Sequence, residues 1–311
     1  MKKAIVTGAN GFVGLWLVKE LVSNGVEVTA VVRENSNRLE CIKDLNGVKI
    51  VYNDLSNIRN LSEKIKDCNF DVFYHLAWTG STGPDRADYA LQLKNVKYTV
   101  DAVNAASKLK CKKFVGAGTL AEFDCNSYIP LDGATPNSVT CYGTAKLTSH
   151  YMSKAECNKL GIEHGWAYLS NTYGIGNRTQ NFVNFACKTM ITGKSADFTA
   201  GEQPYDFVYV SDTARGLYCI GENGKNNFSY YIGSAEPTKL KEFIFKIRDA
   251  VDKNIKLNLG AIPFNGIQLP ASVFDCTKLV EHTGYKASVS FDEGIKITVD
   301  WLRKEIEEER I

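Results

Sequence analysis

The sequence predicts an α/β protein built on a doubly wound parallel sheet, with a smaller C-terminal α/β lobe. Short apolar runs alternate with stretches of helical periodicity through the first half of the chain, as expected of right-handed strand–helix–strand units. The chain also begins with an apolar run, a glycine-rich loop and an amphipathic stretch. We therefore expect residues 1–170 to form the sheet domain and residues 171–311 mainly the lobe, with a return to the sheet domain around 206–250.

The first element is a strand that leads into a glycine loop. Residues 4–7 are apolar and mostly β-branched, which favours a buried strand, and residues 12–21 have helical spacing. Between them, Gly8 permits a tight turn, Gly11 leaves room for phosphates and Gly14 lets the helix pack closely. Free amides at the helix start would bind a pyrophosphate. The loop thus indicates a dinucleotide site in a Rossmann-type domain. The expected contacts are Gly8, Asn10, Gly11, Phe12, Val13 and Gly14.

The remaining elements of the sheet domain follow in regular order, because each apolar run ends at a polar or glycine-rich loop. The expected strands are residues 26–32, 48–52, 70–76, 113–117 and 162–169, and the expected helices are residues 58–65, 89–109 and 141–160. Ligands of such sheets bind at the carboxyl edge of the strands. The later strand-like stretches 206–210 and 230–233 alternate too irregularly for a second large sheet, which predicts the smaller lobe.

The residue after the second strand bears on the choice of dinucleotide. An acidic residue there favours the free 2′-hydroxyl of NAD(H), whereas an arginine favours the 2′-phosphate of NADP(H). Arg33 occupies this position, with Arg38 nearby, and a guanidinium binds phosphate bidentately. We therefore expect NADP(H) to be preferred. The neighbouring Glu34 leaves NAD(H) possible, and Arg33 then becomes a solvated loop residue.

Composition excludes several classes of partner. The 311 residues carry a net charge of +2 with no dense cluster of Lys and Arg, which argues against nucleic acid and membrane surfaces. The nine cysteines are scattered and include no C-x-x-C pair, as in a reduced, cytoplasmic protein. The four histidines lack metal-ligand spacing, so we expect no metal site. The expected partner is a small molecule.

Three residues have the chemistry of a hydride-transfer site. Tyr142 and Lys146 are one helical turn apart on one face, and a nearby ammonium lowers the pKa of a phenol. This spacing alone is common in surface pairs. Thr119, however, ends the fifth strand at the same sheet edge as the glycine loop. We therefore expect Thr119 to polarise a carbonyl or carbinol oxygen, Tyr142 to exchange its proton, and Lys146 to tune Tyr142 and hold the nicotinamide ribose.

With these residues in place, the chain resembles the extended short-chain dehydrogenase/reductase family, which contains nucleotide-sugar epimerases, dehydratases and ketoreductases. The resemblance covers nearly the whole chain. It rests on Thr7-Gly8-x-x-Gly11-x-x-Gly14, Asp54-Leu55, His75-Leu76-Ala77, Asn95, Thr119, Tyr142-x-x-x-Lys146, Asn171-x-Tyr173-Gly174, Asp206-Phe207-Val208-Tyr209-Val210-x-Asp212 and Gly284-Tyr285. It implies further cofactor contacts from Asp54, Leu55, Leu76, Ala77, Asn95, Tyr142 and Lys146. It also implies a homodimer that buries Val96, Val100, Val103, Leu147 and Tyr151.

Departures from the family pattern narrow the expected reaction. Family 4,6-dehydratases follow the strand-end hydroxyl with Asp-Glu, and carbanion epimerases place a cysteine two residues after it; this chain has Leu120 and Ala121. We expect NADPH-dependent reduction of the 4-keto group of a nucleotide-diphospho-deoxysugar, with Tyr142 as proton donor. An NAD-dependent nucleotide-sugar C4-epimerase is the alternative, and Arg33 argues against it. A non-catalytic NADP(H)-binding sensor is the third hypothesis.

The expected substrate contacts also depart from the family. Two arginines usually bind the sugar diphosphate, but Tyr205 stands before Asp206, and residues 266–274 contain no arginine. Arg178 is the expected replacement for one of them, and Tyr205 is placed to stack on a base. The full set of expected substrate contacts is Thr79, Thr119, Glu122, Asn171, Arg178 and Tyr205.

Overall fold

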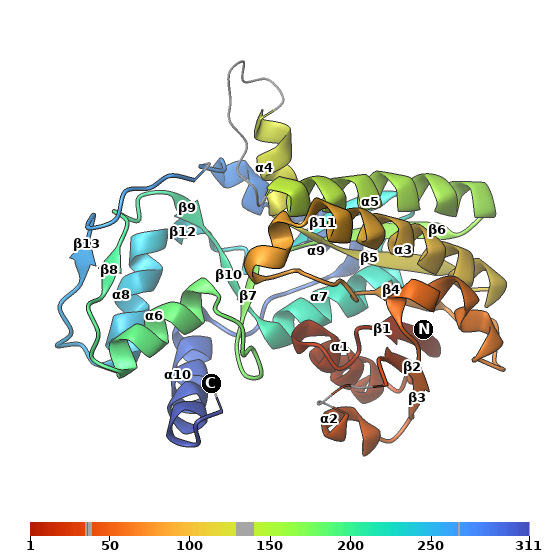
Figure 1. Cartoon of the computed structure of the whole chain (residues 1–311), viewed down its shortest axis with the longest axis horizontal. Coiled ribbons are helices and arrows are strands. Elements are labelled where there is room, and N and C mark those ends of the chain that lie inside the picture. Colours follow the sequence, from red (N-terminus) through yellow and green to blue (C-terminus); the bar gives the residue numbers. More distant parts are fainter. Residues whose placement is uncertain (35, 37–38, 129–139, 267, 311) are drawn as a thin grey trace. The chain divides into compact units, whose positions relative to one another are not determined.

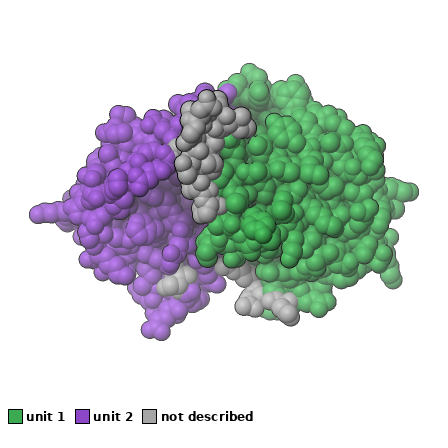
Figure 2. Space-filling model, turned by 45° about the horizontal axis from the view of Figure 1, so that its top comes forward, with its two compact units in different colours: residues 1–169, 213–232, 277–285 green, residues 170–212, 233–276, 286–311 purple. Residues whose placement is uncertain are grey.

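The computed structural model describes residues 1–34, 36, 39–128, 140–266 and 268–310, so Arg38 lies outside the described residues. The chain forms two compact units, which Figure 2 distinguishes by colour. Unit 1 comprises residues 1–169, 213–232 and 277–285, and unit 2 comprises residues 170–212, 233–276 and 286–311. The first return of the chain to unit 1 is therefore shorter than the expected 206–250. The chain returns to unit 1 a second time at residues 277–285, which the sequence did not predict.

Unit 1 contains the parallel sheet that the sequence predicts. Its seven strands lie in the order β11-β6-β5-β4-β1-β2-β3, so the strand order reverses beside β1 (Figure 1). The strands are β1 Lys3–Thr7, β2 Glu27–Val32, β3 Val48–Tyr52, β4 Val72–His75, β5 Lys113–Thr119, β6 Glu163–Leu169 and β11 Phe228–Ile232. All six pairings are parallel. The predicted doubly wound class is confirmed.

Helices of unit 1 cover this sheet and follow the predicted periodicity. They are α1 Phe12–Ser23, α2 Glu40–Lys43, η1 Leu55–Glu63, η2 Gly83–Ala87, α3 Tyr89–Lys108, α4 Ala121–Tyr128, α5 Thr140–Leu160 and α9 Thr277–Thr283; α7, Val210–Asn223, begins in unit 2 and continues here. Helices α3 and α5 pack against each other (Figure 1). Beneath α3, Ile5, Phe73 and Phe114 of the sheet join a fully buried core with Ala102 and Ala106. This rigid layer positions the ends of β1, β4 and β5.

Unit 2 consists of small paired strands and helices around an aromatic core. Strand β7 (Asn171–Tyr173) pairs with β10 (Phe207–Tyr209), β8 (Asp197–Phe198) with β13 (Asn258–Leu259), and β9 (Pro204–Tyr205) with β12 (Thr238–Lys239). The helices are α6 Phe182–Ile191, α8 Leu240–Val251, η3 Ala271–Phe274 and α10 Phe291–Glu307. Phe207 contacts the rings of Phe182, Phe243 and Phe291. The strand expected at 230–233 overlaps β11, which pairs with β6 in unit 1 and lies within the expected return to the sheet domain.

The described residues include no helix that is both long and apolar enough to span a membrane. Across the same residues, no group of three or more His, Cys, Asp or Glu side chains is placed to hold a metal ion.

Candidate active site

The glycine loop forms a backbone cradle between β1 and α1. Gly8 has a φ of 69°, and a Cβ atom there would lie 2.9 Å from the amide nitrogen of Ala77. A Cβ at Gly14 would lie only 2.0 Å from the carbonyl oxygen of Gly8, so any side chain would separate the helix from the turn. Helix α1 has Gly11 as its N-cap and no side-chain cap. Its first amides therefore remain available, and the cradle fits the pyrophosphate of a dinucleotide.

The end of β4 is fixed against this cradle. The Thr7 Oγ1 and His75 Nδ1 atoms lie 3.0 Å apart, and the Ala77 amide donates to Thr7 Oγ1 over 3.3 Å. Burial, together with a smaller effect of the Lys146 charge, lowers the pKa of His75 to about 3, so this imidazole stays neutral. The predicted contacts Leu76 and Ala77 thus border the turn at Gly8.

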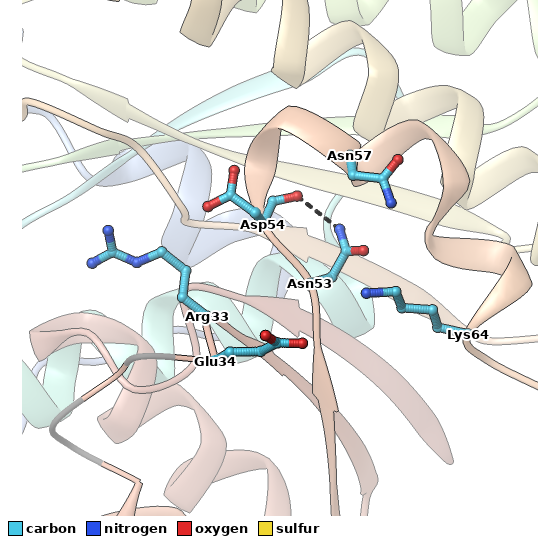
Figure 3. Close-up of a pocket in the computed structure, with 6 residues that line it drawn as sticks. All are labelled: Arg33, Glu34, Asn53, Asp54, Asn57 and Lys64. Atoms are coloured by element: carbon cyan, nitrogen blue, oxygen red, sulfur yellow. Dashed lines mark hydrogen bonds between the residues drawn. The ribbon is translucent and has the colours of Figure 1, made fainter.

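A polar pocket of about 500 Å³ lies where β2 and β3 end (Figure 3). It is lined by Arg33, Glu34, Asn53, Asp54, Asn57 and Lys64. Asp54 accepts hydrogen bonds from the Ser56 amide and hydroxyl; these bonds and, to a smaller extent, the Arg33 charge lower the pKa of its carboxyl group. The side chains of Arg33 and Glu34 point in different directions (Figure 3). This pocket is where the family resemblance places the adenosine end of the cofactor.

The three predicted catalytic residues come together at the carboxyl edge of the sheet. Thr119 is the last residue of β5, and Tyr142 and Lys146 lie in the first turns of α5. The Thr119 and Tyr142 side chains are hydrogen-bonded to each other. Both residues of α5 are buried, and the Lys146 ammonium donates to the carbonyl oxygen of Ala117 over 2.8 Å. The spacing predicted from the sequence therefore brings hydroxyl, phenol and amine to one place.

Trp78 and Arg86 also belong to this site, and the sequence pattern did not predict them. The Lys146 Nζ atom lies 3.8 Å from the ring centre of Trp78, whose indole meets the Tyr142 ring edge-on at a centroid distance of 6.0 Å. The guanidinium carbon of Arg86 lies 4.5 Å from the centre of the Tyr142 ring. Both residues belong to the segment after β4, at the sheet edge where ligands bind. That position was the available signal, since neither side chain forms part of a motif.

The electrostatics of Tyr142 differ from the expectation. Burial raises its pKa and Glu122 adds to this rise, whereas the Arg86 charge and the hydrogen bond from Thr119 act in the opposite direction. Burial also lowers the pKa of Lys146 to about 7, against a smaller opposing effect of Glu122. Lys146 was expected to lower the pKa of Tyr142, but its ammonium is directed to Ala117 and Trp78. The cation in contact with the Tyr142 ring is Arg86.

The Asn95 side chain is hydrogen-bonded to the backbone of Thr79. The sequence predicts a cofactor contact for Asn95 and a substrate contact for Thr79. The Asn95 side chain accepts from the Thr79 amide over 3.1 Å and donates to the Thr79 carbonyl over 2.8 Å. Asn95 is 1% exposed, and its amide group is hydrogen-bonded to the backbone of this loop. A direct cofactor contact stays a prediction for the Asn95 side chain. Its physical role is to satisfy the backbone of the loop after β4.

Glu122, for which a substrate contact is expected, lies inside the protein, and that contact stays a prediction. Its side chain is 1% exposed. The carboxylate accepts from the Thr119 amide at 2.9 Å and from Trp166 Nε1 at 3.2 Å, and His150 Nδ1 lies 3.4 Å away. A Cβ atom on Gly118 would lie 2.5 Å from this carboxylate and 2.2 Å from Trp166 Nε1. Gly118 thus creates the space in which Glu122 supports Thr119 from behind.

The expected substrate residues of unit 2 are partly engaged with one another. The Tyr205 hydroxyl donates to Asn171 Oδ1 over 3.3 Å, and the Asn171 amide donates to the carbonyl oxygen of Asp206 over 3.1 Å. Arg178 Nε donates to the carboxylate of Glu305 over 2.7 Å, and Glu305 is buried. Arg178 therefore neutralises a buried charge, a function that its sequence position did not reveal.

A glycine-lined dinucleotide cradle beside a buried Thr–Tyr–Lys group defines an NAD(P)-dependent enzyme of the oxidoreductase type. The model of the NAD dependent epimerase/dehydratase family matches residues 4–233, and the chain belongs to this family. The predicted membership of the extended short-chain dehydrogenase/reductases is thereby confirmed.

Relatives of this chain cover nearly its whole length. It is 26% identical over 310 residues to a putative UDP-glucose 4-epimerase of Methanocaldococcus jannaschii, covering 96% of this chain and 98% of the relative. It is 22% identical over 308 residues to the CDP-abequose synthase of Salmonella muenchen, covering 95% and 96%. The crystal structure of the Bordetella bronchiseptica enzyme WbmF in complex with NADH has a TM-score of 0.81 at 22% identity, covering 99% and 94%. This last likeness shows the fold.

Proposed function

We propose that this enzyme reduces the 4-keto group of a nucleotide-diphospho-deoxysugar with NADPH, and that Tyr142 donates the proton. The observation that carries the proposal is that the Glu122 carboxylate points into the protein, toward the Thr119 amide and Trp166. Dehydration needs an acid and a base beside the strand-end hydroxyl, but Leu120 and Ala121 stand there, and the nearby carboxylate of Glu122 is buried against Thr119 and Trp166. Among the described residues, the group hydrogen-bonded to Thr119 that we assign to exchange the proton is Tyr142.

Each residue of the group has a distinct role in this proposal. Thr119 donates its hydroxyl hydrogen to the substrate oxygen and orients it, while Tyr142 transfers a proton to that oxygen. Lys146 holds the ribose of the cofactor, and the apolar ring of Trp78 keeps water from its amine. The bound nicotinamide supplies the hydride to the carbonyl carbon. We assign the dinucleotide to unit 1 and the nucleotide sugar mainly to unit 2.

The preference for NADPH rests on Arg33. This residue lines the polar pocket at the end of β2, where Asp54 occupies the neighbouring strand end. The lining offers the 2′-phosphate a guanidinium and an ammonium, from Arg33 and Lys64. The Lys64 ammonium also donates to the Tyr52 carbonyl over 2.8 Å, which keeps this wall of the pocket in place.

The test is a screen of NADPH oxidation against nucleotide-linked 4-keto sugars that differ in base and sugar. We expect turnover with at least one member, and Tyr142→Phe should reduce kcat by about 10²- to 10⁴-fold while NADPH affinity stays within a few-fold. Loss of NADPH affinity in this variant would make Tyr142 a structural residue and overturn its assigned role.

A C4-epimerase is the second candidate, because a relative covering nearly the whole chain is named a putative UDP-glucose 4-epimerase. Such a reaction uses the same Thr119, Tyr142 and Lys146, but returns the hydride to the same sugar. The two functions are separated by mass spectrometry of cofactor released from the denatured protein. Release of stoichiometric NAD from the protein, together with interconversion of two nucleotide sugars at C4 without net reduction, would favour the epimerase over the reductase.

We also propose a homodimer through the outer faces of α3 and α5. The interface predicted from sequence needs correction, because Val96 and Val103 are buried within the protomer against its own core. The exposed large apolar residues described on these helices are Tyr89, Leu93, Tyr151 and Met152, of which Tyr151 belongs to the expected interface. Analytical ultracentrifugation should show a dimer at micromolar concentration, and Leu93→Asp should shift it toward the monomer. A wild-type monomer would contradict the proposal.

A further inference from the structure

The loop between β4 and α3 is held in place by a buried glutamine. Gln92 is 1% exposed, and its side chain accepts a hydrogen bond from Trp78 Nε1 at 2.9 Å. Its amide group donates to the carbonyl oxygens of Gly80 and Asp85, each at 2.9 Å. One side chain thus fixes three points of the loop. Because Arg86 directly follows the last of these points, its backbone is positioned before any ligand binds.

Arg86 lies over the ring of Tyr142. Its guanidinium carbon is 4.5 Å from the ring centre, well within the range of a cation–π contact. The Nε atom of Arg86 is buried and has no hydrogen-bond partner among the described residues. Burying part of a guanidinium in this way costs free energy. The contact with the Tyr142 ring and the interaction with Asp124 offset part of this free-energy cost.

Among the described residues, the charges considered around Tyr142 come from three elements. Arg86 approaches from η2, Glu122 lies on α4, and Lys146 lies on α5 with Tyr142 itself; Asp124 of α4 interacts with Arg86. Among these groups, Arg86 lowers the pKa of Tyr142 and Glu122 raises it. Lys146 has a pKa of about 7, so its charge varies near neutral pH, whereas an arginine keeps its charge throughout this range.

We propose that Arg86 is a positioning residue that acts through Tyr142: its permanent positive charge stabilises the phenolate that Tyr142 becomes after it has given its proton to the substrate. In this step the phenolic O–H bond breaks, the proton goes to the carbonyl oxygen, and the electron pair stays on the phenolate. The hydride that reaches the carbon comes from the reduced nicotinamide. The inference rests on the proposed role of Tyr142 as proton donor.

The kinetic test compares Arg86→Met with Arg86→Lys across the pH range. Removing the cation makes Tyr142 a weaker acid, so Arg86→Met should lower kcat about tenfold at neutral pH and move the alkaline limb of the kcat profile about one pH unit upward. Arg86→Lys should restore most of kcat. A fall in kcat with an unmoved limb in Arg86→Met would assign Arg86 a structural role and overturn the proposal.

A second measurement needs no turnover. Tyrosine labelled with ¹³C at Cζ reports its own ionisation by NMR, and the Tyr142 signal among the 15 tyrosines is assigned by its loss in Tyr142→Phe. Its titration midpoint should rise in Arg86→Met and stay unchanged in the control Arg303→Met, an exposed arginine of α10. An unchanged midpoint in both variants would overturn the inference. The proposed function fails separately, if Tyr142→Phe retains full turnover.

Discussion

Two regions of the carboxyl edge in unit 1 are built by different means. The dinucleotide cradle is made of backbone: Gly8, Gly11 and Gly14 form it by having no side chains. Apart from the packing of Gly8 against Leu76 and Ala77, its contacts are local in sequence. The Thr119–Tyr142–Lys146 group is instead held by buried side chains from distant parts of the chain. Glu122 supports Thr119, and Gln92 holds the loop that carries Trp78 and Arg86.

This difference determines how each region responds to change. A backbone cradle tolerates no added atom, since the space is defined by main-chain groups that have no freedom to move apart. A site supported by side chains depends instead on every buried donor keeping its acceptor. The first region should therefore fail through steric overlap, and the second through unsatisfied hydrogen bonds.

The largest effect is expected from Gly14→Ala. The new Cβ would overlap the Gly8 carbonyl oxygen at 2.0 Å, so the turn and helix must separate. We expect dinucleotide affinity to fall about 100-fold and the free energy of unfolding by about 1–3 kcal/mol. Isothermal titration calorimetry measures the affinity. The control is Gly161→Ala, where φ is positive, unlike at Gly14, but a Cβ meets nothing within 4 Å; it should lose stability alone.

Glu122→Ala tests the second region. It leaves the Thr119 amide and Trp166 Nε1–H without an acceptor, at about 1–3 kcal/mol each. We expect a clear fall in the urea midpoint and at least a tenfold loss of kcat, because Thr119 loses its support. Glu122→Gln retains one acceptor oxygen and should recover most of the stability. Equal damage in both variants would mean that negative charge, and not acceptor geometry, is what matters here.

Lys146→Met should change how stability depends on pH. Lys146 has a folded pKa of about 7, below its unfolded value of 10.5, so the unfolded chain binds more protons between these values. Stability attributable to this residue therefore rises with pH, by at most about 1.4 kcal/mol per unit. Urea denaturation at neutral and mildly alkaline pH should show a shallower rise in the variant than in the wild type. Parallel curves would show that Lys146 is charged in the folded protein.

The smallest effect is expected from Arg33, in the polar pocket where β2 and β3 end. Arg33 is exposed, so Arg33→Ser should leave stability unchanged and lower the NADPH-to-NADH preference about tenfold. Ratios of kcat/KM for the two cofactors measure this preference, with Arg59→Ser as an exposed control in unit 1. An unchanged ratio would remove the argument for a 2′-phosphate site.

The sequence predicted the sheet and the cradle because both depend on local patterns. Apolar runs located six of the seven sheet strands approximately, and three glycines located the turn. The seventh, β11, overlaps the expected strand-like stretch 230–233, but its pairing with β6 was not predicted, since β6 is distant in sequence. The spacing of Tyr142 and Lys146 also predicted their shared helix face. That pattern did not reveal the direction of the Lys146 amine.

The rest of the site depends on contacts that no spacing encodes. Glu122 is near Thr119 in sequence, and a surface position was as compatible with its chemistry as a buried one. Its burial depends on Trp166 from β6 and on the missing side chain of Gly118. Arg86 was overlooked because its importance depends on Tyr142, more than fifty residues later in the numbering.

Unit 1 is made of three separate stretches of the chain, and this affects how it is synthesised. When a ribosome has translated only the first 169 residues, β6 has no outer neighbour, because β11 comes from residues 228–232. The unpaired edge of β6 carries Trp166, the same residue that fixes Glu122 beneath Thr119. An unpaired strand of this kind invites pairing with other chains. Nascent fragments ending before β11 should therefore depend on chaperones more than the finished protein does.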